Sequence, residues 1–190
     1  MSEPYPTSAY STIKLFAQNI GPILAARIYL RKAELQGRKI RVWGRPETQI
    51  WGTLIVGDRV RLVSTITPME IAVQENAVLE IGENTFINYG TSIAAYDCVK
   101  IGKNCLVGTY VNISDNNFHR SEPDRRNEIP ESRPVILEDN VWLGTRAIIL
   151  PGVKIGAGSI VGAGSVVTHD IPPRVVAAGV PAKVIHTIPD

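Results

Sequence analysis

The sequence is poor in cysteine, in aromatic residues and in excess charge, and each shortage excludes a class of protein. Its 190 residues include two cysteines, Cys98 and Cys105, which are too few for a disulfide-stapled scaffold. Aromatic residues make up 6% of the chain, which suits a thin core of Ile, Val and Ala. The formal net charge of +2 is too small to indicate a nucleic-acid-binding protein.

Long apolar segments are also missing. No run of about eighteen apolar residues occurs, so the sequence predicts no transmembrane helix. The start of the chain lacks an apolar block behind a basic one, so no secretory signal is expected. With only two cysteines, these features predict a reduced, cytoplasmic setting. The length predicts one domain, or one domain with an appendage.

A six-residue repeat dominates residues 137–168. Every sixth residue is a branched apolar one: Leu137, Leu143, Ile149, Ile155, Val161 and Val167. Two positions before each of them the residue is small or branched, and half of the residues that directly follow are glycine. A period of six fits neither one long strand nor a helix. It predicts short strands joined by tight turns, stacked into a solenoid because one unit cannot bury its apolar side chains alone.

Residues 155–162, Ile-Gly-Ala-Gly-Ser-Ile-Val-Gly, resemble the hexapeptide repeat of the left-handed β-helix acyltransferases. The resemblance covers about residues 40–185. It implies an all-β fold, a left-handed parallel β-helix in which three hexapeptides make one triangular coil. It also implies a homotrimer that uses acetyl-coenzyme A as cosubstrate. The handedness comes from the resemblance alone, because ordinary parallel crossovers are right-handed.

The expected organisation has three parts. Residues 1–37 form an N-terminal helical extension, residues 38–170 form the β-helix, and residues 171–190 form a tail. The β-helix is interrupted by a polar loop over residues 114–134, and a polar excursion from a rigid scaffold is where function is expected. The end of the tail should run back along the outside of the last coils.

The extension has helical spacing over residues 11–36, with a break or restart at Gly21-Pro22 and a stop signal at Gly37. Two interpretations stay open. The helix covers the open end of the solenoid, or it lies on a membrane surface with Arg27, Arg31 and Lys32 toward lipid headgroups.

His119, in the polar loop, is the candidate general base. Asp115 precedes it by four residues, and a partner on one ring nitrogen leaves the other free to take a proton. Residues 113–119 resemble the sugar and maltose O-acetyltransferase branch, in which a histidine at this point deprotonates a substrate hydroxyl. The sequence leaves open whether Asp115 or a backbone carbonyl orients the ring. His169 and His186 are expected to be structural or surface residues.

Three more residues match acceptor-site positions of the family. Asn88 and Asp97 resemble substrate-binding residues, although Asn88 also fits an asparagine ladder at a turn. Trp142 has an outward register position, and an outward indole needs a ligand or a neighbouring subunit to cover it.

The resemblance also implies a coenzyme A groove along the outer edge, between two subunits. The matching positions are Gly144, Ala147, Gly162, Ala163, Thr168 and Lys183. Backbone groups near the first four would bind the pantetheine amides, and the last two lie toward the adenosine end, where phosphates need cations or free N–H groups. Lys183 also fits a solvated tail charge.

The sequence therefore predicts an acetyl-coenzyme A-dependent O-acetyltransferase that acts on a sugar or saccharide without a metal. An N-acetyltransferase acting on an amino sugar is one alternative, and a non-catalytic binding solenoid is another. The related γ-class carbonic anhydrases bind zinc through three histidines at coil-matched spacing, which the three histidines here do not have.

Overall fold

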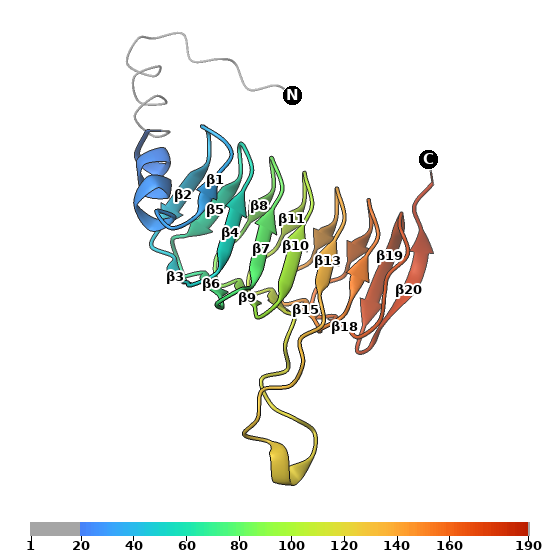
Figure 1. Ribbon diagram of the computed structural model, residues 1–190. Coiled ribbons are helices and arrows are strands. Elements are labelled where there is room, and N and C mark those ends of the chain that lie inside the picture. The colour runs from blue at the N-terminus through green and yellow to red at the C-terminus, as the bar shows by residue number, and fades with distance from the viewer. Residues whose placement is uncertain (1–19, 190) are drawn as a thin grey trace.

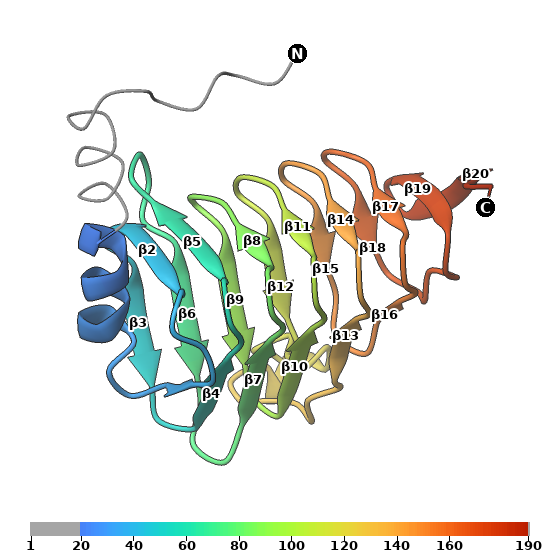
Figure 2. The same ribbon diagram turned by 90° about the horizontal axis from the view of Figure 1, so that it is seen from above.

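The computed structural model describes residues 20–189, as one helix followed by a stack of short strands (Figure 1). The helix spans residues 20–29 and lies at the N-terminal end of the stack (Figures 1 and 2). Ala26 and Leu30 are buried in the same core as the first coils. No helix within the described range is long and apolar enough to cross a bilayer.

The prediction of a helix up to residue 36 was wrong at its C-terminal end. Strand β1 (Glu34–Leu35) pairs in parallel with residues 55–56 instead. This non-local pairing outweighs the local helical spacing, because tertiary contacts override propensity. Residues 11–19 of the expected helix lie outside the described residues.

Three parallel sheets form the sides of a prism. Sheet A contains, in spatial order, β1 (Glu34–Leu35), β4 (Thr53–Val56), β7 (Val78–Ile81), β10 (Cys98–Ile101), β13 (Val135–Leu137) and β16 (Lys154–Ile155). Sheet B contains β2 (Arg41–Gly44), β5 (Arg61–Ser64), β8 (Phe86–Ile87), β11 (Leu106–Val107), β14 (Trp142–Leu143), β17 (Ile160–Val161), β19 (Val175–Gly179) and β20 (Ala182–Thr187). Sheet C contains β3 (Glu47–Ile50), β6 (Glu70–Val73), β9 (Ser92–Ala95), β12 (Asn112–Ser114), β15 (Ile148–Ile149) and β18 (Val166–Val167).

Each coil contributes one strand to each sheet, so three hexapeptides make one turn of the prism. Leu143 pairs with Val107 in the coil before and with Val161 in the coil after. Successive coils visit the three sheets in the same order, A then B then C. The predicted fold class, an all-β left-handed parallel β-helix with an N-terminal helical segment and a C-terminal tail, is confirmed.

The repeat positions predicted to point inward do form the core. All six branched residues of the regular stretch are at most 1% exposed: Leu137, Leu143, Ile149, Ile155, Val161 and Val167. Polar inward residues bond the backbone of the adjacent coil. The Ser159 hydroxyl donates to the Pro172 carbonyl at 2.7 Å, and the Thr85 hydroxyl donates to the Gly102 carbonyl at 2.8 Å. These bonds remove the penalty of burying an unpaired hydroxyl.

The sequence led us to expect that the end of the tail runs back along the outside of the last coils. Instead, the tail lengthens sheet B. β19 pairs in parallel with β17, and β20 folds back antiparallel on β19. The reason is burial: Val175 and Ala177 of β19 are 6% and 0% exposed and cover the core of the last coil.

Candidate active site

The polar loop leaves the stack after β12 and returns at β13. Figure 1 shows it projecting from the side of the prism. Ile113, before the loop, pairs with Ile93 and Ile149, and Leu137, after it, pairs with Ile101. The chain therefore re-enters in register. The projecting segment contains the 3-10 helix η1 (Pro123–Arg125).

Asn116 closes the neck of this loop. It is 2% exposed, and its Nδ2 donates to the Pro130 carbonyl at 2.9 Å and to Ser132 Oγ at 2.8 Å. Its Oδ1 accepts from the backbone N–H of Phe118 at 2.7 Å. One buried amide thus ties the outgoing arm to the returning arm. Sequence reasoning missed Asn116, and the available signal was that Asn readily bonds backbone two residues on.

His119 follows this neck and is exposed. Its Nδ1 lies 2.7 Å from the carbonyl oxygen of Arg126. A carbonyl oxygen can only accept, so Nδ1 carries the proton in the neutral ring and Nε2 keeps its lone pair. Of the two orienting groups that the sequence left open, the backbone carbonyl is the one in contact with the ring.

An ion-pair cluster braces the segment that supplies this carbonyl. Arg125 Nη2 lies 2.6 Å from Glu128 Oε2, and Arg120 Nε lies 3.2 Å from the same atom. The hydrogen bond from Arg125 holds the pKa of the Glu128 carboxyl below its ordinary value. The carboxylate is charged at neutral pH and ties together Arg120 and Arg125, which both lie in the loop that carries His119.

Asp115, the other orienting group that the sequence left open, contacts the corner at residues 96–98. It is 0% exposed, and its carboxylate accepts three backbone hydrogen bonds, from Tyr96 at 2.8 Å, Asp97 at 2.8 Å and Cys98 at 2.7 Å. A pairing of Asp115 with His119, which the sequence had left open as one of two alternatives, is not among these contacts. The reason is that three corner N–H groups converge on the carboxylate, and charge-assisted bonds of this kind are strong.

The same corner contacts the histidine loop through aromatic rings. Tyr96 and Phe118 pack edge to face, with ring centroids 5.3 Å apart and planes at 83°. Asp97 follows Tyr96 and is exposed. The corner carrying Asp97 and the loop carrying His119 are therefore joined twice, by the Asp115 carboxylate and by this ring pair.

The other two candidate acceptor residues lie on sheet B and its corners. Asn88 is half-buried, and its Oδ1 accepts from the Tyr89 N–H at 2.9 Å. The sequence also allowed Asn88 to belong to an asparagine ladder at a turn. The asparagine pair between adjacent coils is formed by other residues: Asn84 Nδ2 donates to Asn104 Oδ1 at 2.8 Å. Trp142 on β14 is 49% exposed.

Trp142 belongs to an outward apolar row on sheet B. Neighbouring strands place, side by side, Phe86, Leu106, Trp142, Ile160 and Val176. Leu106 is 45% exposed. Phe86, Ile160 and Val176 are half-buried, so the row is a partly exposed apolar strip with Leu106 and Trp142 at its centre, and such a strip is suited to a contact surface.

The proposed cofactor positions do not all present free backbone groups. The N–H groups of Gly144 and Gly162 donate to carbonyls of the next coil, Val161 and Ala177, each at 2.8 Å. A Cβ on Gly144 would lie 2.5 Å from the backbone nitrogen of Ala163, so glycine is required here by the close approach of adjacent coils.

The remaining cofactor candidates are spread along the last coils. Ala147 is fully buried and its N–H donates to Gly144 at 3.2 Å, whereas Ala163 is exposed at a turn. Thr168 Oγ1 lies 2.8 Å from His169 Nδ1. Lys183 is exposed on β20. Gly144 and Ala163 are thus brought together, while Lys183 lies on the final strand.

Neither cysteine is suited to nucleophilic chemistry. Burial raises the pKa of the Cys98 thiol and of the Cys105 thiol, so both are neutral at ordinary pH, and a neutral thiol is a poor nucleophile. Among residues 20–189, no group of three or more His, Cys, Asp or Glu side chains is arranged to hold a metal ion.

Comparison with known proteins identifies the family. Residues 134–169 match the family model described as bacterial transferase hexapeptide (six repeats). The chain is 40% identical to the galactoside O-acetyltransferase of Escherichia coli K12 over 139 residues, which cover 67% of this chain and 68% of that protein. The chain belongs to the hexapeptide-repeat acyltransferase family. Other curated members are matched over 53–60% of their own length.

Solved structures of the family share the fold. A maltose O-acetyltransferase from Clostridium difficile 630 is 32% identical, with a TM-score of 0.63, over 85% of this chain and 73% of that one. A galactoside acetyltransferase in complex with coenzyme A is also 32% identical, with a TM-score of 0.57, over 82% of this chain and 66% of that one.

Proposed function

We propose that this acyltransferase moves an acetyl group from acetyl-coenzyme A to a hydroxyl group of a sugar or saccharide, with His119 as general base. The names of its family members and the coenzyme A complex of one of them support the reaction class. The observation that carries the role of His119 is the hydrogen bond between its Nδ1 and the Arg126 carbonyl at 2.7 Å, on an exposed ring.

In this reaction, Nε2 of His119 removes the proton of the acceptor hydroxyl as the oxygen attacks the thioester carbonyl carbon. A C–O bond forms, the C–S bond breaks, and the leaving thiolate takes the proton back from the imidazolium. The products are the acetyl ester and coenzyme A. No covalent acyl-enzyme is needed, because positioning both substrates together supplies much of the acceleration. A neutral imidazole suits this role near neutral pH.

We assign Asn88, Asp97 and Trp142 as contacts of the acceptor. Asp97 lies at the corner between sheets C and A that adjoins the histidine loop, whereas Asn88 and Trp142 lie at sheet B, so in the proposed trimer these two would reach the acceptor from a neighbouring protomer. Asp115 acts at the Asp97 corner as a positioning residue through its three bonds to the Tyr96–Cys98 backbone. An acceptor held at this corner lies between two segments that are fixed to each other.

The proposed working unit is a homotrimer in the cytoplasm, with coenzyme A between protomers. The outward apolar row on sheet B supports an interface, and the two free thiols fit a reduced compartment. Along this groove we place the pantetheine arm and the adenosine end at Gly144, Ala147, Gly162, Ala163, Thr168 and Lys183. With three backbone N–H groups used inside the stack, carbonyl oxygens and the exposed turn at Ala163 are the groups left to bind amides.

The test is His119→Ala, assayed by thiol release from acetyl-coenzyme A across a panel of sugars and their amino analogues. Turnover is expected to fall by about 10²–10⁴-fold, while the melting temperature and coenzyme A affinity stay unchanged. His186→Ala, which removes an exposed imidazole on β20, is the matched control. An unchanged rate in His119→Ala overturns the role of His119. Acetylation of the amino analogues alone overturns O-acetylation.

A further inference from the structure

We infer that the N-terminal end of the prism docks on a bilayer that contains anionic lipids. The inference does not depend on acetyl transfer. It rests on three observations: an apolar helix face that the fold leaves exposed, an excess of cations at this end of the chain, and a cavity beside the helix that has both an apolar and a cationic wall.

The helix presents apolar side chains on two sides. Ala26 and Leu30 are 1% and 0% exposed and pack into the core of the prism. Ile20, Leu24 and Ile28 are 40%, 57% and 62% exposed. Residues four apart lie on one line of a helix, so these three form a single outward stripe. A helix that only caps a core needs one apolar face, and the second face is therefore available for another contact.

Positive charge is concentrated at the same end. Residues 20–64 contain nine Lys or Arg and three Asp or Glu, which gives +6, whereas residues 65–189 contain ten and thirteen, which gives −3. Arg27 and Arg31 are exposed on the helix side of the prism. Apolar side chains flanked by cations are the pattern of helices that lie in the interface of an anionic membrane.

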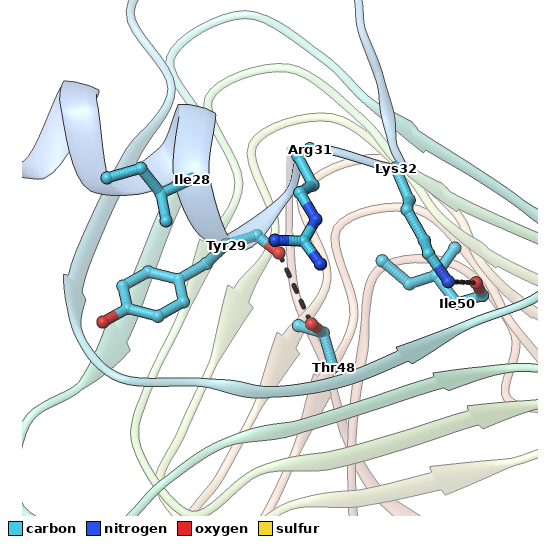
Figure 3. A pocket seen from close by; sticks show the side chains of 6 residues that line it. All are labelled: Ile28, Tyr29, Arg31, Lys32, Thr48 and Ile50. Carbon is cyan, nitrogen blue, oxygen red and sulfur yellow. Dashed lines mark hydrogen bonds between the residues drawn. The ribbon is translucent and has the colours of Figure 1, made fainter.

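A cavity of about 270 Å³ lies between the end of the helix and β3 (Figure 3), lined by Ile28, Tyr29, Arg31, Lys32, Thr48 and Ile50. Lys32 Nζ donates to the Ile50 carbonyl at 3.1 Å, which holds the ammonium at the wall of the cavity. Within residues 20–189, neither Arg31 nor Lys32 forms an ion pair with a carboxylate. The site therefore combines unneutralised cations with apolar walls, which matches a phospholipid headgroup and the start of its acyl chains.

The charge also argues against a second copy of this chain as the occupant. Two copies meeting through this stripe would bring two cationic ends together, and like charges repel. The outward row on sheet B, from Phe86 to Val176, already offers an apolar surface for contacts between copies. An anionic lipid surface would bury the apolar stripe and neutralise the basic residues at the same time.

The experiment is cosedimentation of the full chain with vesicles of phosphatidylcholine alone or of equal parts phosphatidylcholine and phosphatidylglycerol. We expect binding to the anionic vesicles, weakened by added salt because the Debye length shortens. Leu24→Gln with Ile28→Gln should abolish binding. Arg27→Gln with Arg31→Gln should weaken it by about 25-fold, since each basic residue near an anionic surface contributes about fivefold.

Matched controls lie far from the helix. Ile185→Gln removes an apolar residue that is 65% exposed on β20, and Lys103→Gln removes an exposed cation at a corner of the coils; both should bind like the parent. The inference is overturned if the parent ignores anionic vesicles or if the helix variants bind equally well. It is also overturned if light scattering shows that the Leu24→Gln, Ile28→Gln variant forms a smaller oligomer than the parent. That result would mean that the stripe contacts a second copy of the chain. Acetylation of a soluble sugar should be unchanged in every variant, so this test and that of the proposed reaction fail separately.

Discussion

The regular coils after residue 134 and the loop over residues 115–134 are held by opposite means. In the coils, every strand repeats the same backbone ladder and buries the same kind of branched side chain. In the loop, the geometry depends on the buried Asp115 and Asn116 and on one carbonyl, that of Arg126. Stability is thus spread over many equivalent contacts, whereas the placement of His119 rests on a few. We therefore expect that a substitution in the loop can abolish the activity while the coils stay folded.

The largest expected loss of stability is in a regular coil. Leu143→Ala removes a fully buried side chain from the centre of the stack and should lower the free energy of unfolding by about 2–5 kcal/mol. Urea denaturation followed by circular dichroism measures it. Ile148→Ala, on an outward position that is 37% exposed, should change the same quantity by less than about 1.5 kcal/mol. Equal losses in both variants would contradict the inward and outward assignment.

A substitution at the neck of the loop is expected to lower turnover more than stability. Asn116→Ala leaves the Pro130 carbonyl and the Phe118 N–H without their partner, so the two arms should separate. We expect turnover to fall by about 10–100-fold, because small misplacements of a catalytic group are costly. The global unfolding energy should fall by only about 1–3 kcal/mol. Limited proteolysis of the loop gives an independent readout.

Asn117→Ala is the control for this variant, since the Asn117 side chain is exposed and only its carbonyl bonds the His119 N–H. It should behave like the parent in turnover and in proteolysis. A proteolysis rate and a turnover that are both unchanged in Asn116→Ala would show that the neck does not control the loop.

A smaller effect tests whether Asp115 orients His119 or holds the Tyr96–Cys98 backbone. Asp115→Asn replaces an acceptor of three N–H bonds with an amide that can accept at only one oxygen. The KM for the sugar should rise by about tenfold as the Tyr96–Cys98 corner loosens. The pH profile of kcat should keep its midpoint, because the Arg126 carbonyl holds the ring. A shifted midpoint would instead assign Asp115 to His119.

The smallest effect concerns pH and a surface pair of the coils. Lys154 lies 2.7 Å from Glu138, and this hydrogen bond, aided by the Ala157 N–H, holds the pKa of Glu138 below its ordinary value. A carboxyl with a lowered folded pKa stabilises the fold above its unfolded pKa, and the contribution disappears as pH falls through the folded pKa. The melting temperature of the parent should therefore fall slightly more in acid than that of Glu138→Gln. Parallel acid titrations of the two proteins are the measurement.

The sequence predicted the coils well because their contacts are periodic. A residue such as Val161 meets equivalent neighbours in the coils on both sides, so its inward position follows from spacing alone. The predicted C-terminal end of the helix was wrong because Glu34–Leu35 pairs with a strand about twenty residues away, and local spacing does not encode that pairing. The contacts of the loop could not be predicted for the same reason. Asp115 accepts hydrogen bonds from a corner of the preceding coil, and Asn116 donates to residues that return from the far side of the loop.

The uneven ends of the three sheets set a limit on growth. Sheet B continues through β19 and the antiparallel β20, whereas sheets A and C stop at β16 and β18. A second prism placed head to tail would have to match three parallel edges at once, and the overhanging hairpin prevents that register. An open strand edge is a template on which another chain can pair, and repeated pairing of this kind leads to aggregation. The β19–β20 hairpin therefore blocks head-to-tail stacking of prisms, and a variant without the hairpin is expected to form filaments.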